Sequence, residues 1–457
     1  MRKVTEMLWV ALLALPLAAF AANQPQEKIL ANGLKVIVKE DHRAPVVVSQ
    51  VWYRAGSMDE HNGTTGVAHV LEHMMFKGTK SVPAGEFSKR VAAAGGRDNA
   101  ATDTDFTFYH QVIGRSKLPL VLGLEADRMH NLLLSEKEFA KEIEVVRNER
   151  RWRIDDKPHA LVQVQLMATA FEANPYHWPV IGWMDDLQHM TVQDARAWYQ
   201  AWYAPNNAVL VVAGDVQAPE VFKLAEHYFG PIKRKVLPVR KPQQEPEQTG
   251  IRRVVVKAPA KLPYLLMGWK APRLKDAAKD SDPYALEMLA GVLDANPAAR
   301  LPKALVRDSQ IAADVDAGYD SVQRGPDLFE IDGTPSEGKS VGQLEAAIRA
   351  ELEKIKRDGI TEEELARVKA QVIASRVYQR DSVFYQAMQI GQMEMSGLGY
   401  QNIDTRIEKL KAVTPQQVQA VARKYLVDDQ LTVATLDPQP LSEKQPMAPP
   451  KGLRDEK

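Results

Sequence analysis

The sequence of 457 residues contains no cysteine, and none of its ten histidines lies beyond residue 227. The absence of cysteine excludes disulfides and thiolate metal ligands, so a metal site in this chain must use histidine and carboxylate side chains. Neither sign of charge is in excess, because 59 Lys and Arg balance 59 Asp and Glu. This balance argues against a basic surface for nucleic acid. The length exceeds that of a single hydrophobic core and predicts two or three domains.

The N-terminal segment 1–21 has the pattern of a secretory signal peptide. Arg2 and Lys3 precede an apolar run over residues 8–20, and Ala19-Phe20-Ala21 is a small-x-small cleavage site. The run is too short to span a bilayer, and no later segment is long enough. We therefore expect export, with a bacterial periplasmic location favoured, and no membrane attachment after cleavage.

Three residues in the first half, His69, Glu72 and His73, form an H-x-x-E-H motif inside an apolar stretch. We expect this stretch to be a helix, with Thr64 or Thr65 as its N-cap. Helical positions i and i+4 share a face and i+3 lies beside them, so both imidazoles project together with a carboxylate next to them. Two neutral imidazoles can hold Zn²⁺, and the carboxylate can accept the proton of an activated water. The alternative is a pair of buried core histidines without a metal.

A catalytic zinc site needs one protein ligand besides the two histidines. The stretch 136–155 is expected to be an acidic helix. Glu138, Glu142 and Glu149 fall on one of its faces, while Glu144 points away. Spacing alone leaves both Glu142 and Glu149 open as the third ligand. The alternative is a charged face that contacts only solvent.

Two segments of the chain repeat one another at a constant offset, so that position 191 corresponds to position 414 and position 208 to position 431. Thr191-Val192-Gln193 leads to an apolar strand at 208–213, and Thr414-Pro415-Gln416 leads to one at 431–436. A repeat near half the mature length predicts two similar domains. The predicted organisation is a signal peptide at 1–21, a catalytic zinc-binding domain at 22–230, a linker at 231–250, a second homologous domain without the metal motif at 251–437 and a disordered tail at 438–457.

Several short motifs along the chain are informative when taken together. They are Ala55-Gly56-Ser57, Ala68-His69-Val70-Leu71-Glu72-His73-Met74, Phe76-Lys77-Gly78-Thr79, Gly95-Gly96, Asn99-Ala100, Thr102, Glu142 to Glu149, Trp202 to Asn207 and Val212 to Asp215. This set resembles the inverted-motif zinc peptidases, the family of pitrilysin, insulin-degrading enzyme and mitochondrial processing peptidase. The resemblance covers most of residues 26–230 and, more loosely, 250–437. It implies an α+β fold of two similar domains, each an antiparallel sheet packed with helices, that face each other across a cleft.

The resemblance also implies roles for individual residues. It places Glu149 at the third metal ligand, Glu142 at the outer carboxylate that orients a ligand and Glu72 at the general base. Asn99 and Ala100 resemble the family's substrate strand, where a peptide adds to a sheet edge through main-chain bonds. The alternative for Asn99 is an ordinary turn residue. One Zn²⁺ per chain and a dimer of two-domain chains follow from the same resemblance.

The second half departs from the family pattern at one position. Many members carry an Arg and, seven residues later, a Tyr that help to hold the substrate over the zinc. Arg307 matches the Arg, but Asp314 stands seven residues on, and Tyr319 is out of register. A complementary subunit that has the Arg/Tyr pair and lacks the histidine motif would restore this function. We therefore expect a heterodimer in which this chain is the metal-binding subunit.

The expected function is a secreted, periplasmic zinc endopeptidase that hydrolyses peptides or unfolded polypeptide segments. One alternative is a non-catalytic scaffold or binding subunit of a peptidase-like complex, and the intact set His69, Glu72, His73 and Glu149 argues against it. A second alternative is a metal-binding periplasmic chaperone, which needs no base at Glu72. Replacing Glu72 with Gln separates these functions, because only the peptidase loses its activity while it keeps the metal.

Overall fold

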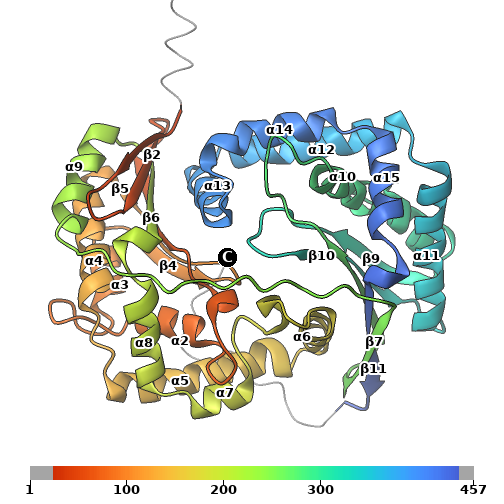
Figure 1. Cartoon of the computed structure of the whole chain (residues 1–457), viewed down its shortest axis with the longest axis horizontal. Coiled ribbons are helices and arrows are strands. Elements are labelled where there is room, and N and C mark those ends of the chain that lie inside the picture. Colours follow the sequence, from red (N-terminus) through yellow and green to blue (C-terminus); the bar gives the residue numbers. More distant parts are fainter. Residues whose placement is uncertain (1–23, 442–457) are drawn as a thin grey trace, which may run out of the picture.

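The computed structural model describes residues 24–441. Two β-sheets lie on opposite sides of the molecule, with helices between them (Figure 1). The first sheet has the strand order β1-β2-β6-β3-β5-β4, with β1 (Gln26–Ile29), β2 (Lys35–Glu40), β3 (Val46–Tyr53), β4 (Arg97–Thr102), β5 (Thr107–Gly114) and β6 (Ala208–Gly214). The second has the order β7-β11-β8-β10-β9, with β7 (Arg252–Pro259), β8 (Tyr264–Ala271), β9 (Ala312–Gly318), β10 (Asp327–Pro335) and β11 (Leu431–Gln439). The predicted α+β class is confirmed.

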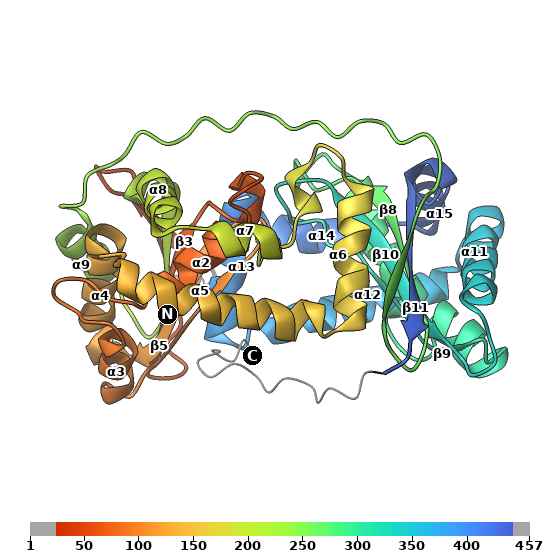
Figure 2. The same ribbon diagram turned by 90° about the horizontal axis from the view of Figure 1, so that it is seen from below.

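Most helices pack on the outer faces of these sheets (Figures 1 and 2). In chain order they are α2 (Val67–Met74), α3 (Glu86–Ala93), α4 (Leu118–Asn131), α5 (Glu136–Arg150), α6 (Pro158–Ala170), α7 (Met184–His189), α8 (Val192–Trp202), α9 (Ala218–Phe229), α10 (Asp282–Asp294), α11 (Val341–Asp358), α12 (Glu362–Gln379), α13 (Val383–Ser396), α14 (Ile403–Ala412) and α15 (Pro415–Tyr425). π-helical segments occur at Arg151–Asp155 and Pro302–Asp308. Within residues 24–441, no helix combines the length and the apolar composition that crossing a membrane requires.

The sheets are mixed, whereas the sequence predicts antiparallel ones. β2 pairs with β6 in parallel, and β7 pairs with β11 in parallel, while the other described pairs in both sheets are antiparallel. A parallel pair needs a long crossover connection. The helices between β2 and β6, and between β7 and β11, supply that connection in each half.

Each half of the chain contributes one helix to the inner face of the other half's sheet. Helix α6, from the first half, packs on β7, β8 and β11, where Leu166 lies in one cluster with Leu266. Helix α13, from the second half, packs on β3 and β6, where Ile390 clusters with Val211 and Trp52. Because of this exchange, burial of apolar surface holds the two halves together.

One glycine permits the close approach of α13 to the first sheet. A Cβ atom at Gly391 would lie 2.1 Å from Cε2 of Trp52. Trp52 is fully buried and stacks on Phe108 with a centroid distance of 4.3 Å. A side chain at position 391 would overlap this buried indole, so glycine is favoured at the crossing.

The internal repeat predicted from the sequence is present in the structure. Helix α8 spans 192–202 and α15 spans 415–425, and both begin with a threonine capping box, at Thr191 and Thr414. Strands β6 and β11 begin at 208 and 431. However, β11 extends to Gln439, so the prediction that residues 438 and 439 are disordered is wrong. Residues 442–457 and the predicted signal peptide at 1–21 lie outside the described residues.

The predicted linker at 231–250 is a strap that runs along one side of the molecule (Figure 2). Residues 233–249 contain neither helix nor strand. Arg240 lies over the Trp202 ring at 4.3 Å and donates to Asp59 at 2.6 Å. Glu245 accepts three backbone N–H bonds from residues 172–174 and pairs with Lys270 at 2.9 Å. The strap is therefore attached to both halves.

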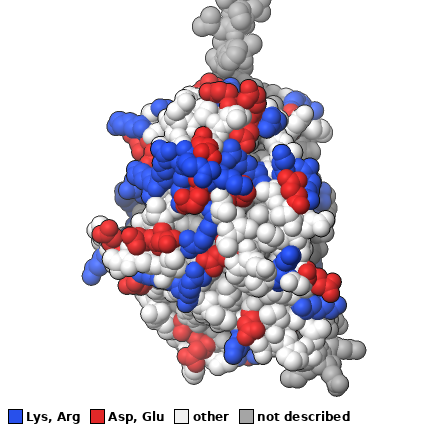
Figure 3. All heavy atoms as spheres, turned by 90° about the vertical axis from the view of Figure 1, so that its right-hand side faces the viewer, with Lys and Arg blue, Asp and Glu red and all other residues white. Residues whose placement is uncertain are grey.

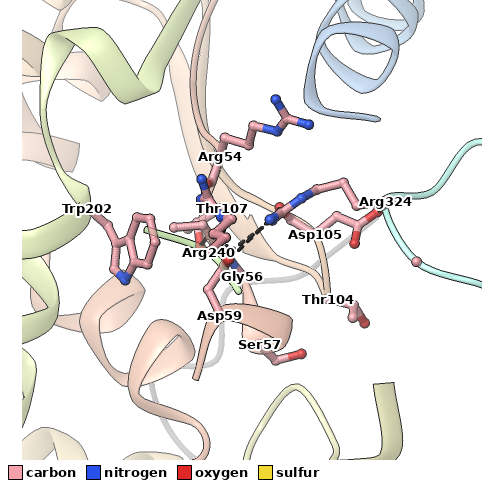
Figure 4. Close-up of polar contacts among 12 residues, drawn as sticks. Arg54, Gly56, Ser57, Asp59, Thr104, Asp105, Thr107, Trp202, Arg240 and Arg324 are labelled. Atoms are coloured by element: carbon pink, nitrogen blue, oxygen red, sulfur yellow. Dashed lines mark hydrogen bonds and ion pairs between the residues drawn. The ribbon is translucent and has the colours of Figure 1, made fainter. Parts of the chain in front are cut away.

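A buried polar network joins the halves next to the segment that precedes α2 (Figure 4). Arg324, from the loop between β9 and β10, donates to Asp59 Oδ2 at 2.8 Å. Its backbone N–H donates to Asp105 at 2.6 Å, and the Tyr176 hydroxyl donates to the same carboxylate at 2.5 Å. Burial raises the pKa of Asp105 to about 6. These contacts connect β10 of the second half to the region of the motif helix.

The outer end of the second half presents a band of Lys and Arg with Asp and Glu among them (Figure 3). Helix α11 lies on this side of the molecule and carries several ion pairs (Figure 1). Arg253 and Arg349 both contact Glu345, at 2.7 and 3.1 Å, and Lys356 contacts Glu353 at 2.8 Å. Exposed pairs of this kind contribute at most about 1 kcal/mol each. They make this face a solvated surface of paired charges.

Candidate metal centre

The motif helix α2 begins at a point set by glycine and by a carboxylate from the preceding segment. Gly66, the N-cap, has φ +87°, and a Cβ there would lie 2.4 Å from the carbonyl oxygen of Ile181. The buried Glu60 accepts the N–H of Gly66 at 2.7 Å and that of residue 68 at 2.8 Å. The prediction that Thr64 or Thr65 caps the helix is wrong. The Glu60 carboxylate satisfies the free N–H groups instead.

The two imidazoles of α2 project from one face of the helix toward α5. Their ring centroids are 4.7 Å apart, and both rings face Glu149. Nε2 of His69 lies 3.8 Å from Glu149 Oε1, and Nε2 of His73 lies 3.3 Å from Oε2. The structure therefore brings together, from two helices, the three residues proposed as ligands.

Glu142 lies behind His73, on the side away from Glu149. Its Oε1 is 3.0 Å from Nδ1 of His73, and its Oε2 is 2.5 Å from Nζ of Lys77. An ionised carboxylate can only accept, so Nδ1 carries a hydrogen. In the neutral imidazole that binds a metal, the lone pair is then on Nε2. Glu144 pairs with Arg147 instead. Glu142 thus has the geometry of an outer carboxylate that orients a metal-binding histidine.

The buried charges perturb the three central pKa values strongly. Burial lowers the pKa of His69 to about 3. Burial alone would also lower the pKa of His73, but its contacts with Glu142 and Glu149 raise it to about 9. Burial alone would raise the pKa of Glu149, but His73 and the other nearby positive charges lower it to about 2. The Glu149 carboxylate is therefore held ionised, which is the form that binds a cation.

The donor set and its spacing fit a zinc ion. One ligand atom from each of His69, His73 and Glu149 lies within 4.8 Å of the others, and no other such group occurs in residues 24–441. A tetrahedral Zn²⁺ with ligand bonds near 2.0–2.1 Å separates its ligand atoms by roughly 3.4 Å. In addition, the buried Oε2 of Glu149 has no hydrogen-bond partner. A divalent cation bound here would satisfy this oxygen. The observed spacing is close to the spacing that zinc needs, so neither imidazole would have to move far.

Glu72 lies beside the cluster and is not part of it. It is 6% exposed, and its Oε2 accepts a hydrogen bond from the Thr102 hydroxyl at 2.6 Å. A carboxylate that is adjacent to a metal site and outside the ligand set can serve as a proton acceptor.

The residues expected to bind substrate divide into two groups. Asn99 and Ala100 lie on β4, the edge strand of the first sheet, so the turn alternative for Asn99 is excluded. Arg307 is exposed on the π-helical segment Pro302–Asp308, in the second half of the chain. Asp314 lies on the edge strand β9. The Tyr319 hydroxyl donates to the carbonyl of residue 272, so this tyrosine is engaged within its own half.

Three residues that contact the centre were not predicted from the sequence. Lys77 follows His73 by four residues and contacts Glu142. Arg153 follows Glu149 by four residues and contacts its Oε1 at 3.1 Å. The i, i+4 rule of a helix could have identified Arg153. Lys77 lies beyond the end of α2 and contacts Glu142, so local spacing does not identify it. No local spacing relates Thr102 to Glu72 either.

The similarity of this chain to known proteins covers most of its length. A family described as Insulinase (Peptidase family M16) matches residues 35–182, and one described as Peptidase M16 inactive domain matches residues 189–372. The chain belongs to peptidase family M16. This result confirms the family that the motifs predict. The metal cluster lies in the first matched region, and the chain has no histidine after residue 227.

Relatives of this M16 chain include proteins named as zinc proteases. It is 35% identical over 422 residues to "Zinc protease PqqE" of Helicobacter pylori, covering 90% of this chain and 92% of that protein. It is 26% identical over 400 residues to the uncharacterized zinc protease YmxG of Bacillus subtilis, with 87% and 95% covered. A crystal structure of a protease from H. pylori superposes with a TM-score of 0.86 at 31% identity, over 91% of this chain and all of that one. The first half of the periplasmic protease PqqL from Escherichia coli has a TM-score of 0.76 at 18% identity, over 90% and 91%, which shows the shared fold alone.

Proposed function

We propose that this chain is a zinc-dependent endopeptidase that hydrolyses peptides or unfolded polypeptide segments in the periplasm. One observation carries the proposal. His69, His73 and Glu149 converge to within 4.8 Å, and a separate carboxylate, Glu72, stands next to them. Membership of peptidase family M16 and the zinc proteases among the relatives support it.

The residues of the centre divide the chemistry between them. A Zn²⁺ held by His69, His73 and Glu149 would polarise the scissile carbonyl and lower the pKa of a water molecule. Glu72 accepts the proton of that water and returns it to the leaving amine. β4 is the last strand of the first sheet, and an extended peptide added to it through main-chain bonds would place its peptide bond beside the centre.

The decisive variant is Glu72→Gln, which keeps the side-chain volume and removes the proton acceptor. We expect one zinc per chain and a loss of peptide hydrolysis of about 10²- to 10⁴-fold. Glu144→Gln, on the exposed side of α5, is the matched control and should retain the full rate. Zinc content by elemental analysis and cleavage of an internally quenched peptide measure the two properties. Normal turnover by Glu72→Gln would refute the peptidase and favour the scaffold or chaperone alternative.

We also propose that the active form is a heterodimer with a homologous subunit that lacks the histidine motif. Asp314 stands where the family resemblance expects a tyrosine, so this chain carries only Arg307 of the pair. The partner would supply a complete pair for binding the peptide. Activity is measured for the purified chain alone and after mixing with the partner. Equal activity in both samples would refute the heterodimer.

The periplasmic location rests on the signal-peptide pattern of residues 1–21. The related protein PqqL of E. coli is described as a periplasmic protease. Cell fractionation tests the location: the mature chain should appear in the osmotic-shock fraction, shortened by cleavage after the small-x-small site at 19–21. Full-length chain in the cytosolic fraction would refute it.

A further inference from the structure

The proposed general base is held by a threonine hydroxyl from a different element. Thr102 Oγ1 donates a hydrogen bond to Glu72 Oε2 at 2.6 Å. Because Glu72 is 6% exposed, this bond forms away from bulk solvent. A hydroxyl makes a shorter and stronger bond to an ionised carboxylate than to a neutral acceptor. The contact therefore restricts rotation of the carboxylate.

The pleat of β4 decides where the Thr102 side chain points. Successive side chains of a strand point to opposite faces. Ala100 is 2% exposed in the core under the sheet, and Asp98 accepts a hydrogen bond from Ser88 of α3 at 2.7 Å. Thr102 shares this face, toward which α2 also packs. Its β-branched side chain has a stiff χ1, so the strand presents the hydroxyl in one orientation.

Strand β4 is also the element proposed to bind an extended peptide. It is the last strand of the first sheet and pairs with β5 on one side. Its end is anchored, because Thr102 pairs with Thr107, whose hydroxyl donates to the carbonyl of Ala55 at 3.0 Å. One strand thus carries both the edge proposed to bind the peptide and the group that holds the base.

We propose that Thr102 is a positioning residue for Glu72, which couples the alignment of a bound peptide strand to the placement of the base. The inference rests on the proposed peptidase function. A peptide added to β4 keeps its register with that strand at about 3.3 Å per residue. The positions of the scissile bond and of the Thr102 hydroxyl are then both fixed relative to β4. Loss of the Thr102 hydrogen bond would let the Glu72 carboxylate move, and a displacement of about 1 Å can reduce a rate by on the order of 100-fold.

The test compares two substitutions at this position. Thr102→Val keeps the shape and the strand propensity but removes the hydroxyl, so it should fold normally. We expect kcat to fall about 10- to 100-fold, with KM and zinc content unchanged. Thr102→Ser keeps the donor and should stay within about threefold of wild type. Thr104→Val, in the turn after the strand, is the matched control and should retain the wild-type kcat.

A double-mutant cycle separates positioning from general structural damage. Because Thr102 acts through the Glu72 carboxylate, Thr102→Val should have no further effect on the residual activity of Glu72→Gln. An additive loss would refute the proposal. An unchanged kcat in Thr102→Val, or a rise in KM that explains the whole loss, would also overturn it.

A crystal structure of Thr102→Val gives a readout that does not depend on activity. The Glu72 carboxylate should leave its wild-type rotamer or occupy several, while His69, His73 and Glu149 stay in place. An unchanged rotamer would contradict the positioning role. If the wild type shows no peptidase activity, or Glu72→Gln loses none, the proposed function fails. The rotamer still decides in that case whether Thr102 holds Glu72.

Discussion

Removal of the Glu142 carboxylate should weaken zinc binding although Glu142 is not a ligand. Glu142 orients His73 through Nδ1 at 3.0 Å and neutralises Lys77 at 2.5 Å. Loss of an outer carboxylate of this kind lowers metal affinity by about 10- to 100-fold, which corresponds to about 1.4 to 2.7 kcal/mol. We expect Glu142→Ala at the upper end, because the Lys77 charge would remain beside the metal-binding His73 without its partner. Glu142→Gln retains an acceptor oxygen and should lie at the lower end.

The assay is competition for Zn²⁺ against a chelator of known affinity at neutral pH. Glu138→Ala is the matched control, since Glu138 lies one turn earlier on the same helix and pairs with Lys141. The control should bind zinc with wild-type affinity. If Glu142→Ala also bound zinc within about threefold of wild type, the orienting role of this carboxylate would be refuted.

Three further predictions concern the ligand set and the junction of the two halves. Glu149→Ala should abolish stoichiometric zinc binding, because two imidazoles remain; bound metal after dialysis measures this, and a full equivalent of zinc would contradict the ligand assignment. Gly391→Ala should lower the free energy of unfolding by about 1 to 3 kcal/mol, because its Cβ would overlap Trp52. Urea denaturation measures this, and an unchanged free energy of unfolding would contradict the prediction by showing that the indole can move. Asp105 has a pKa raised to about 6, so its protonated form favours the folded state and stability decreases as pH rises from about 4 to 6. Relative to Asp105→Asn, wild type should lose up to about 3 kcal/mol over that range in urea denaturation, and parallel pH profiles would refute the assignment.

The sequence alone determined the features whose signals repeat along the chain. The i, i+4 spacing of His69 and His73 placed both imidazoles on one face, because helical geometry dictates it. The same periodicity separated Glu142 and Glu149 from Glu144. The internal repeat relates α8 to α15 and β6 to β11.

Longer motifs added the family and, through it, the α+β class with two similar halves. Spacing left Glu142 and Glu149 equivalent, and the family resemblance alone favoured Glu149. The predicted threonine cap failed for a related reason. The carboxylate that caps α2 comes from Glu60, and only the folded path of the chain brings it to Gly66.

Tertiary structure decided every relation between elements that lie far apart in the chain. The packing of α5 on α2 directs Glu149 to both imidazoles and places Glu142 behind one of them. The exchange of α6 and α13 between the sheets, and the contact of Thr102 with Glu72, are of the same kind. Local periodicity specifies which side chains share a face. The direction in which that face points depends on how the cores pack, and this involves residues from distant parts of the sequence.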